Sequence, residues 1–118
     1  MKELLKQQKN NTDFVLILST AKNIGEAEKL AALLVKERAA ACVSLSSPVT
    51  SVYRWRDNVE IEKEVTLFIK TIVENYKKVE ELILNNHKYE VPEIICLPII
   101  DGEPNYLNWI VENSTNPE

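Results

Sequence analysis

The sequence is short of the residues from which most active sites are built. It contains two glycines, Gly25 and Gly102, and one histidine, His87. Phosphate-binding loops and dinucleotide fingerprints need several closely spaced glycines, so neither can be built here. A serine–histidine–acid relay would have to use His87, yet the sequence has no nucleophile-elbow motif. We therefore predict a protein that is not an enzyme.

Cysteine is also scarce, with Cys42 and Cys96 in separate apolar segments. The sequence has no CxxC pair and no cysteine–histidine cluster, which excludes the usual structural zinc motifs. We expect both cysteines to be reduced thiols in the core of a cytoplasmic protein. A disulfide or a metal-binding pair is the alternative.

The sequence has neither an excess of positive charge nor a long apolar run. Lysine and arginine number 14 against 18 aspartates and glutamates, which gives a net charge of −4. A general nucleic-acid binder usually carries a basic patch, and no run approaches the ~18 apolar residues of a membrane span. Residues 1–12 lack the apolar centre of a signal peptide, and we expect them to form a flexible tail. We therefore expect neither nucleic acid nor a membrane as a partner.

The rest of the chain alternates strands and helices in the order βαββαβ. Residues 14–20 (FVLILST) are an unbroken apolar run, typical of a strand buried on both faces. Asn23 and Glu26 form a capping-box pattern for a helix that ends near Arg38. The later elements are expected at residues 40–71 (a long hairpin), 74–86 (a helix), 93–100 (a strand) and from 104 (a short helix that buries Tyr106, Trp109 and Ile110).

This order predicts an α+β, ferredoxin-like sandwich with an antiparallel sheet and helices on one face. One domain is expected over residues 13–113, followed by a disordered tail at 114–118. The second face of the sheet has no helices of its own, although its strands are apolar. We expect partner subunits to cover it.

The hairpin at residues 40–71 is the most informative stretch. From residue 59 to residue 71 the odd positions are mostly apolar and the even positions mostly polar, which is typical of a half-buried strand. Thirteen residues at ~3.3 Å each span ~43 Å, whereas a compact chain of this size is ~35 Å across. The hairpin should therefore protrude and be covered by other copies of the chain in an obligate oligomer. We expect Asp57-Asn58 to form its turn, and Pro48 to mark a bulge, bend or edge in its first arm.

Two groups on the hairpin carry chemistry, and each has two interpretations. Glu60, Glu62 and Glu64 form a carboxylate row that would bind a hard cation, or else a solvated face that pairs with neighbouring cations. Tyr53 and Trp55 would be stacking platforms for RNA, or else anchors of a protein interface. The acidic composition favours the solvated face and the interface.

His87 follows the second helix. An imidazole is a candidate ligand for a soft or borderline metal ion. A lone histidine at a helix end more often interacts with the last carbonyl groups. On spacing alone we favour this second role.

Several segments together resemble the CutA divalent-cation tolerance family. They are AACVS (40–44), SVYRW (51–55), VEIEKEV (59–65), IKT (69–71), HKYEVPEII (87–95), LPI (97–99) and YLNWI (106–110). The resemblance covers residues 14–110. It implies a ferredoxin-like subunit in a tight homotrimer, with long strands that join sheets between subunits, and a likeness to trimeric PII-type signalling proteins.

The resemblance also implies which residues serve a cleft or interface between subunits. Those transferred are Cys42, Tyr53, Trp55, Glu60, Glu64, Lys70, Tyr89, Pro92, Glu93, Tyr106 and Trp109. A ligand pocket would form if Tyr53, Trp55, Glu60, Lys70 and Glu93 converge across subunits. Bacterial relatives have proposed copper ligands at the positions that Ser19, Asn86 and His87 occupy here. Only His87 is of the expected type. Asp57 also departs from the family, whose hairpins usually carry glycine there.

The expected function is a cytoplasmic homotrimer associated with divalent metal, especially copper, tolerance or homeostasis. It would bind a metal ion or small ligand weakly, or act through a protein partner in signalling. The alternative is an enzyme or ligand-binding protein that holds a small anionic molecule in a cleft between subunits.

Overall fold

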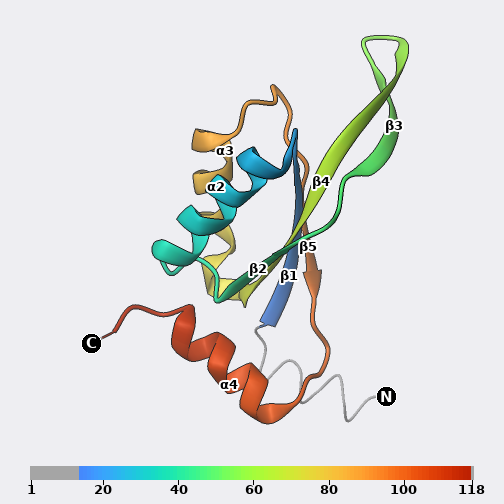
Figure 1. Ribbon diagram of the computed structural model, residues 1–118. Coiled ribbons are helices and arrows are strands. Elements are labelled where there is room, and N and C mark those ends of the chain that lie inside the picture. Colours follow the sequence, from blue (N-terminus) through green and yellow to red (C-terminus); the bar gives the residue numbers. More distant parts are fainter. Residues whose placement is uncertain (1–13, 118) are drawn as a thin grey trace.

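The computed structural model describes residues 14–117 (Figure 1). The expected tail at residues 1–12 lies outside this range. The elements are β1 (Phe14–Ala21), α2 (Ile24–Lys36), β2 (Cys42–Leu45), β3 (Val49–Trp55), β4 (Asn58–Ile72), a 3₁₀ turn (Val73–Asn75), α3 (Tyr76–Asn86), β5 (Ile94–Pro98) and α4 (Pro104–Asn113). None of these helices is long and apolar enough to cross a membrane.

The sheet has the order β2-β4-β1-β5, and β3 pairs with the far part of β4. Each of these neighbours is antiparallel. Helices α2 and α3 cover one face of the sheet, and α4 lies across its lower end in Figure 1. The predicted α+β ferredoxin-like fold is thus confirmed, with β5 at an edge where Pro98 needs no second ladder partner.

The core lies between the sheet and the two covering helices. Val15, Ile17 and Ser19 of β1 are buried, and α2 contributes the buried Leu34. Leu16 and the other residues that alternate with them are only half-buried. The expectation that β1 is buried on both faces is therefore wrong for the single chain, because no helix covers its second face.

That second face, called the open face below, is apolar. Antiparallel register places Leu18 opposite Phe68 and Ile95, and Leu16 opposite Leu97. Phe68 is 36% exposed, Ile95 48% and Leu97 40%. Since directly paired residues share one side of a sheet, these five side chains form a continuous apolar surface that the chain itself leaves uncovered.

Helix α2 begins and ends as its sequence dictates. The Asn23 side chain accepts a hydrogen bond of 2.8 Å from the Glu26 backbone N–H, as the capping pattern predicts. The helix ends at Lys36, two residues before the expected Arg38, which has a φ of 56°. A left-handed residue after a helix redirects the chain, and here the Ala39 N–H bonds back to Leu34 O at 2.9 Å.

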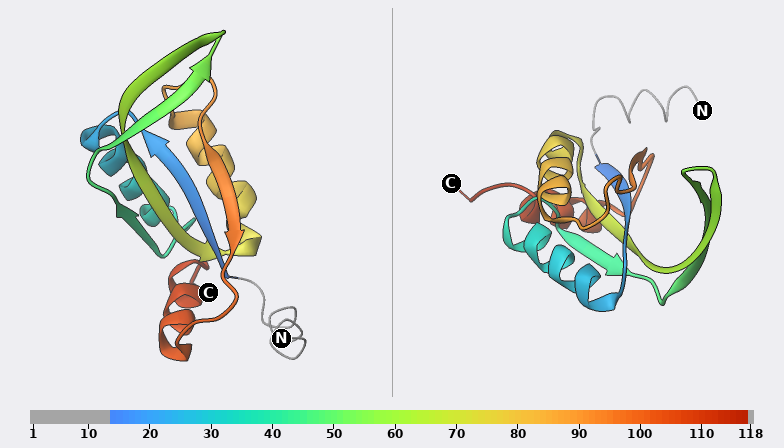
Figure 2. Two further views of the ribbon diagram at one scale, coloured as in Figure 1. Left: turned by 90° about the vertical axis from the view of Figure 1, so that its right-hand side faces the viewer. Right: turned by 90° about the horizontal axis from the view of Figure 1, so that it is seen from above.

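The hairpin protrudes as its length predicts. β4 is 15 residues long, and the β3–β4 tip extends away from the body and curves (Figures 1 and 2). The radius of gyration is 15.5 Å, against ~13–14 Å for a compact chain of this length. Ser46-Ser47-Pro48 separate β2 from β3, so the expected break at Pro48 is confirmed.

The hairpin turn lies one residue earlier than predicted. Trp55 pairs with Asn58, so the two loop residues are Arg56 and Asp57, with φ values of 49° and 69°. Two successive positive φ values are the geometry of a type I′ turn, whose twist matches that of the strands. The prediction of Asp57-Asn58 was wrong because it read turn propensity alone and not the strand pairing.

Replacing Asp57 with Gly should stabilise the hairpin by about 0.5–1 kcal/mol, because glycine has no Cβ penalty at positive φ. Urea unfolding at one fixed protein concentration measures the change. The matched control is Asn58→Gly, which places the same residue inside β4 and should destabilise by a similar amount. If Asn58→Gly stabilises as well, the turn lies at Asp57-Asn58, where the sequence alone placed it.

Two expectations about burial need correction. Cys42 is half-buried and Cys96 is exposed, and both are free thiols, so neither is a core cysteine. In α4 only Ile110 is buried, whereas Tyr106 and Trp109 are 42% and 41% exposed. Both errors have one cause, since strand edges and the open end of the sheet leave apolar segments uncovered in a single chain.

The chain after α4 returns to the body. Disorder is expected from residue 114, yet Ser114 is 2% exposed and its carbonyl accepts a bond of 2.6 Å from Asn75 Nδ2. Arg38 Nη1 donates to Thr115 O at 3.1 Å. These contacts fix the start of the tail against the end of α2.

Candidate functional site

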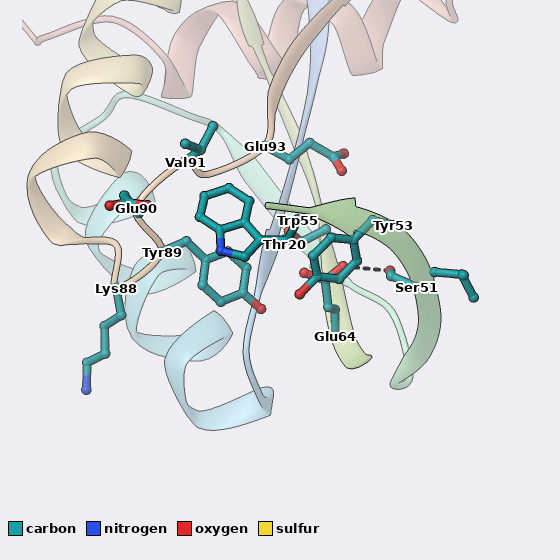
Figure 3. A pocket seen from close by; sticks show the side chains of 11 residues that line it. Thr20, Ser51, Tyr53, Trp55, Glu64, Lys88, Tyr89, Glu90, Val91 and Glu93 are labelled. Atoms are coloured by element: carbon teal, nitrogen blue, oxygen red, sulfur yellow. Dashed lines mark hydrogen bonds between the residues drawn. The ribbon is translucent and has the colours of Figure 1, made fainter. Parts of the chain in front are cut away.

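A cavity of about 770 Å³ lies between the hairpin and the loop of residues 87–93 that follows α3. Figure 3 shows its lining, with aromatic rings and carboxylates brought together from both sides. The lining residues are Thr20, Ser51, Val52, Tyr53, Trp55, Glu64, Lys88, Tyr89, Glu90, Val91 and Glu93.

The alternation of side chains along β3 determines which hairpin residues face the cavity. Ser51, Tyr53 and Trp55 recur at every second position of β3 and therefore share a face. Register places Glu62 and Glu60 of β4 opposite the first two. One step further along β4, the Glu64 carboxylate accepts a hydrogen bond of 2.6 Å from Ser51 Oγ. The hairpin thus presents rings, a hydroxyl and carboxylates on one face.

The loop side is held by His87. Its Nε2 bonds to Thr20 O at 2.5 Å, and its Nδ1 accepts from the Tyr89 backbone N–H at 3.0 Å. A carbonyl oxygen can only accept, so Nε2 carries the proton and both ring nitrogens are engaged. The His87 and Tyr89 rings lie 4.6 Å apart. His87 therefore fastens the loop to the end of β1 and sets the position of Tyr89.

The two tyrosines of the cavity are held in their neutral form. Burial, followed by a hydrogen bond with Glu64 and the charge of that carboxylate, raises the pKa of Tyr89 far above its ordinary value. Burial, followed by the charges of Glu62, Glu60 and Glu64, also raises the pKa of Tyr53. Both phenols are therefore hydrogen-bond donors near neutral pH, and neither can act as a base.

The tip of the hairpin reaches the same loop. Arg56 Nη2 bonds to Glu90 Oε2 at 2.7 Å, and its guanidinium lies 5.1 Å from the centre of the Trp55 ring. The two paired side chains are 70% and 63% exposed, so the ion pair contributes little to stability, about 0–1 kcal/mol. Its role is to position the tip beside the loop.

The structure divides the sequence-predicted site residues into two groups. Five line the cavity, namely Tyr53, Trp55, Glu64, Tyr89 and Glu93. Glu60 lies beside them, opposite Tyr53 on the same hairpin face, but outside the lining.

The second group lies at the other end of the sheet, near α4. Lys70 Nζ is 6.0 Å from the Tyr106 ring, which stacks on Trp109 with a centroid distance of 5.7 Å. Cys42 pairs with Lys70 across β2 and β4. Within one chain, Lys70 is therefore not part of the cavity that contains Tyr53 and Trp55.

Sequence reasoning missed other lining residues. Ser51 could have been found, because it alternates with Tyr53 and Trp55. Lys88, Glu90 and Val91 belong to a loop without periodicity, so only the fold brings them to the cavity. Lys88 Nζ pairs with Glu26 at 3.0 Å and points away from the rings in Figure 3.

The geometry gives little support to a metal centre. Within residues 14–117, no three His, Cys, Asp or Glu side chains gather in a way that could hold an ion. His87 has both nitrogens engaged, Asn86 Nδ2 donates to Leu82 O at 2.8 Å, and Ser19 is buried in the core. The Glu60–Glu62–Glu64 row is only partly solvated, since Glu62 is exposed and Glu60 and Glu64 are half-buried. Arg56 pairs with Glu90 and not with the row.

Comparisons with known proteins agree with one another. The family model described as CutA1 divalent ion tolerance protein matches residues 15–113. The chain is 36% identical over 107 residues to the "Divalent-cation tolerance protein CutA" of Escherichia coli O45:K1, covering 91% of this chain and 96% of that one.

Solved structures are similar as well. The divalent cation tolerance protein Cut A1 of Thermus thermophilus is 38% identical with a TM-score of 0.84, covering 86% of this chain and 99% of that one. The "Periplasmic divalent cation tolerance protein CutA" of Archaeoglobus fulgidus is 31% identical with a TM-score of 0.84, with the same two coverages.

Proposed function

The chain belongs to the CutA1 divalent ion tolerance family, and from that premise we propose that it supports divalent cation tolerance as a non-enzymatic homotrimer in the cytoplasm. Its contribution is the binding of a small ligand or a protein partner, as in a signalling protein, and not tight sequestration of copper.

One observation carries the oligomeric part of the proposal. The open face exposes Phe68 of β4 and Ile95 and Leu97 of β5, with Leu18 of β1 between Phe68 and Ile95. Contiguous apolar surface of this kind marks an interaction site. The hairpin extends from the same sheet, and two of its apolar residues, Val59 and Ile61, are 64% and 68% exposed. Two further copies of the chain would cover both surfaces, and the number three follows the family resemblance.

The non-enzymatic part rests on the chemistry of the cavity. Its tyrosines are held neutral by burial and by neighbouring carboxylates, which raise the pKa of each. The imidazole of His87 is occupied by Thr20 O and the Tyr89 N–H. The tyrosines and the imidazole therefore supply neither a free base nor an activated nucleophile for acid–base or covalent catalysis.

The cavity also argues against the anionic ligand of the alternative function. Glu64, Glu90 and Glu93 line it, and Lys88 is the lining lysine. The Lys88 ammonium is directed to Glu26 at 3.0 Å. An anion would therefore meet carboxylates without a directed positive charge, which is unfavourable.

The cytoplasmic part of the proposal rests on the two free thiols. Cys96 is exposed and Cys42 is half-buried, and neither forms a disulfide. Unpaired, accessible thiols are typical of reducing compartments.

Two measurements test the proposal together. A bacterial strain that lacks its own member of the family should regain growth in elevated copper when it expresses this chain. Calorimetry with copper, zinc, cadmium and magnesium should give at most weak binding, unchanged in His87→Ala and in the neighbouring control Lys88→Ala. Failure of growth rescue by well-expressed protein would contradict the tolerance role. A copper dissociation constant below about 1 µM that is lost only in His87→Ala would show direct copper capture instead.

A further inference from the structure

The cavity between the hairpin and the loop of residues 87–93 combines aromatic ring faces with carboxylates. We propose that it binds a small organic cation, a protonated amine or a quaternary ammonium ion, between the rings of Tyr53, Trp55 and Tyr89 and the carboxylates of Glu64 and Glu93. The inference rests on the ligand-binding step of the proposed function and names the chemical class of the ligand.

The rings supply the first part of the argument. Tyr53, Trp55 and Tyr89 gather around one space in Figure 3. Tyr53 is 42% and Trp55 36% exposed, so their ring surfaces are accessible within the chain. Ring faces are negative and attract a cation within ~6 Å of the centroid. The guanidinium of Arg56, 5.1 Å from the Trp55 centroid, is a cation of this chain that already uses that attraction.

The carboxylates of the cavity differ in whether a positive charge compensates them. Glu90 is paired with Arg56, and the Lys88 ammonium with Glu26, so these charges are compensated. The Glu64 carboxylate accepts a hydrogen bond from the neutral Ser51 hydroxyl, and within residues 14–117 it forms no ion pair.

Glu93 adds a second carboxylate to the lining. Within residues 14–117 its side chain has no ion-pair partner. Glu60 and Glu62, on the same hairpin face, reinforce the negative potential. A positively charged ligand would therefore be attracted to the cavity.

The lining favours an organic cation over a metal ion. A divalent ion needs several oxygen, nitrogen or sulfur ligands within about 2.0–2.6 Å, and the described residues place no three such side chains around one point. The indole, the two phenol rings, Val52 and Val91 offer apolar surface that a hydrated ion cannot use. The methyl or methylene groups of an alkylammonium ion would contact that surface, while its charge faces Glu64 and Glu93.

The test compares a cation with a neutral molecule of similar shape. Tetramethylammonium and tert-butanol are titrated into the full chain at constant ionic strength, and broadening of the ligand methyl resonance in NMR spectra reports binding. We expect saturable binding of tetramethylammonium and none of tert-butanol. Trp55→Leu and Glu64→Gln should each weaken binding roughly fivefold or more. The matched control Glu81→Gln, an exposed residue of α3, removes the same charge elsewhere and should change nothing.

Equal binding of the two probes would overturn the inference, as would equal losses in Glu64→Gln and Glu81→Gln, or unchanged binding in Trp55→Leu. Sedimentation of each variant shows whether its assembly is intact, so a folding defect is recognised. Copper-growth rescue is measured on the same proteins. If rescue and assembly persist while tetramethylammonium does not bind, the ligand class is wrong and the proposed function stands.

Discussion

Replacing Phe68 with Glu is expected to convert the proposed homotrimer into monomers at micromolar concentration. Phe68 lies on the open face opposite Leu18 of β1, which in turn pairs with Ile95 of β5. Full burial of a phenylalanine stabilises by about 1.5–3 kcal/mol, and assembly supplies the part that comes from the 36% of Phe68 still exposed. An unpaired carboxylate buried in its place costs several kcal/mol. Each subunit of the assembly would carry the change, so the effect multiplies. Sedimentation velocity measures the shift in mass.

The matched control is Leu84→Glu on α3. Leu84 is 53% exposed on the helical side of the molecule, away from the open face. This variant should remain an oligomer of unchanged mass. Circular dichroism of both variants separates dissociation from unfolding. If Phe68→Glu sediments as the wild type does, the open face is not the surface that joins the copies.

Replacing Asn75 with Asp is expected to destabilise the fold by about 2–4 kcal/mol. The side-chain NH₂ group, a hydrogen-bond donor, would be replaced by a carboxylate oxygen that faces other oxygen atoms and can only accept. Asn75 Nδ2 lies within 3.2 Å of Arg38 O and of Ala39 O, 3.3 Å from Thr71 Oγ1, and 2.6 Å from Ser114 O. One amide group thus joins the end of α2, β4 and the chain after α4. Urea unfolding at fixed protein concentration measures the loss, since an oligomer's stability depends on concentration.

The stability of Asn75→Asp should also depend on pH in a specific way. Surrounding carbonyl oxygens should raise the pKa of the introduced carboxyl in the folded state. A raised folded pKa contributes stability below the unfolded value that is lost as pH rises through the folded value. The deficit of Asn75→Asp relative to wild type should therefore be smaller at pH 4 than at pH 7. The control Asn108→Asp, exposed on α4, should stay close to wild type. Equal deficits in the two variants would show that the Asn75 contacts contribute nothing specific.

The sequence predicted the secondary-structure elements well where a single local residue pattern determines the structure. The alternation in residues 59–71 gave β4, the Asn23 cap gave the start of α2, and Pro48 gave the break between β2 and β3. The turn was missed by one residue because asparagine and aspartate both tolerate positive φ. The pairing of Trp55 with Asn58 places Asn58 in β4 and makes Arg56 the other loop residue.

Burial was predicted less well than secondary structure. Leu16, Cys96 and Trp109 are as apolar as core residues, but they lie on a face, an edge or an end that one chain leaves uncovered. The hydrophobicity of a side chain predicts that it is buried, but it does not predict whether residues of the same chain or of another chain bury it. These mismatches therefore support the proposed oligomer.

The candidate site was predicted in part. Tyr53 and Trp55 share a face of β3 by alternation, and the hairpin register adds Glu64 of β4 to that face. Tyr89 and Glu93 come from a loop without periodicity, which His87 fastens to β1. Lys70 and Trp109 were assigned to the same cleft by resemblance. Within one chain they lie at the opposite end of the sheet, so only assembly could bring them to the cavity of a neighbour.

Sedimentation equilibrium of the wild-type chain at micromolar concentration tests the central claim most directly, because the proposed trimer is what covers the open face and the protruding hairpin. The account predicts one species with three times the 13.5 kDa mass of a single chain, and no folded monomer. A stable, folded species of 13.5 kDa under these conditions would contradict it.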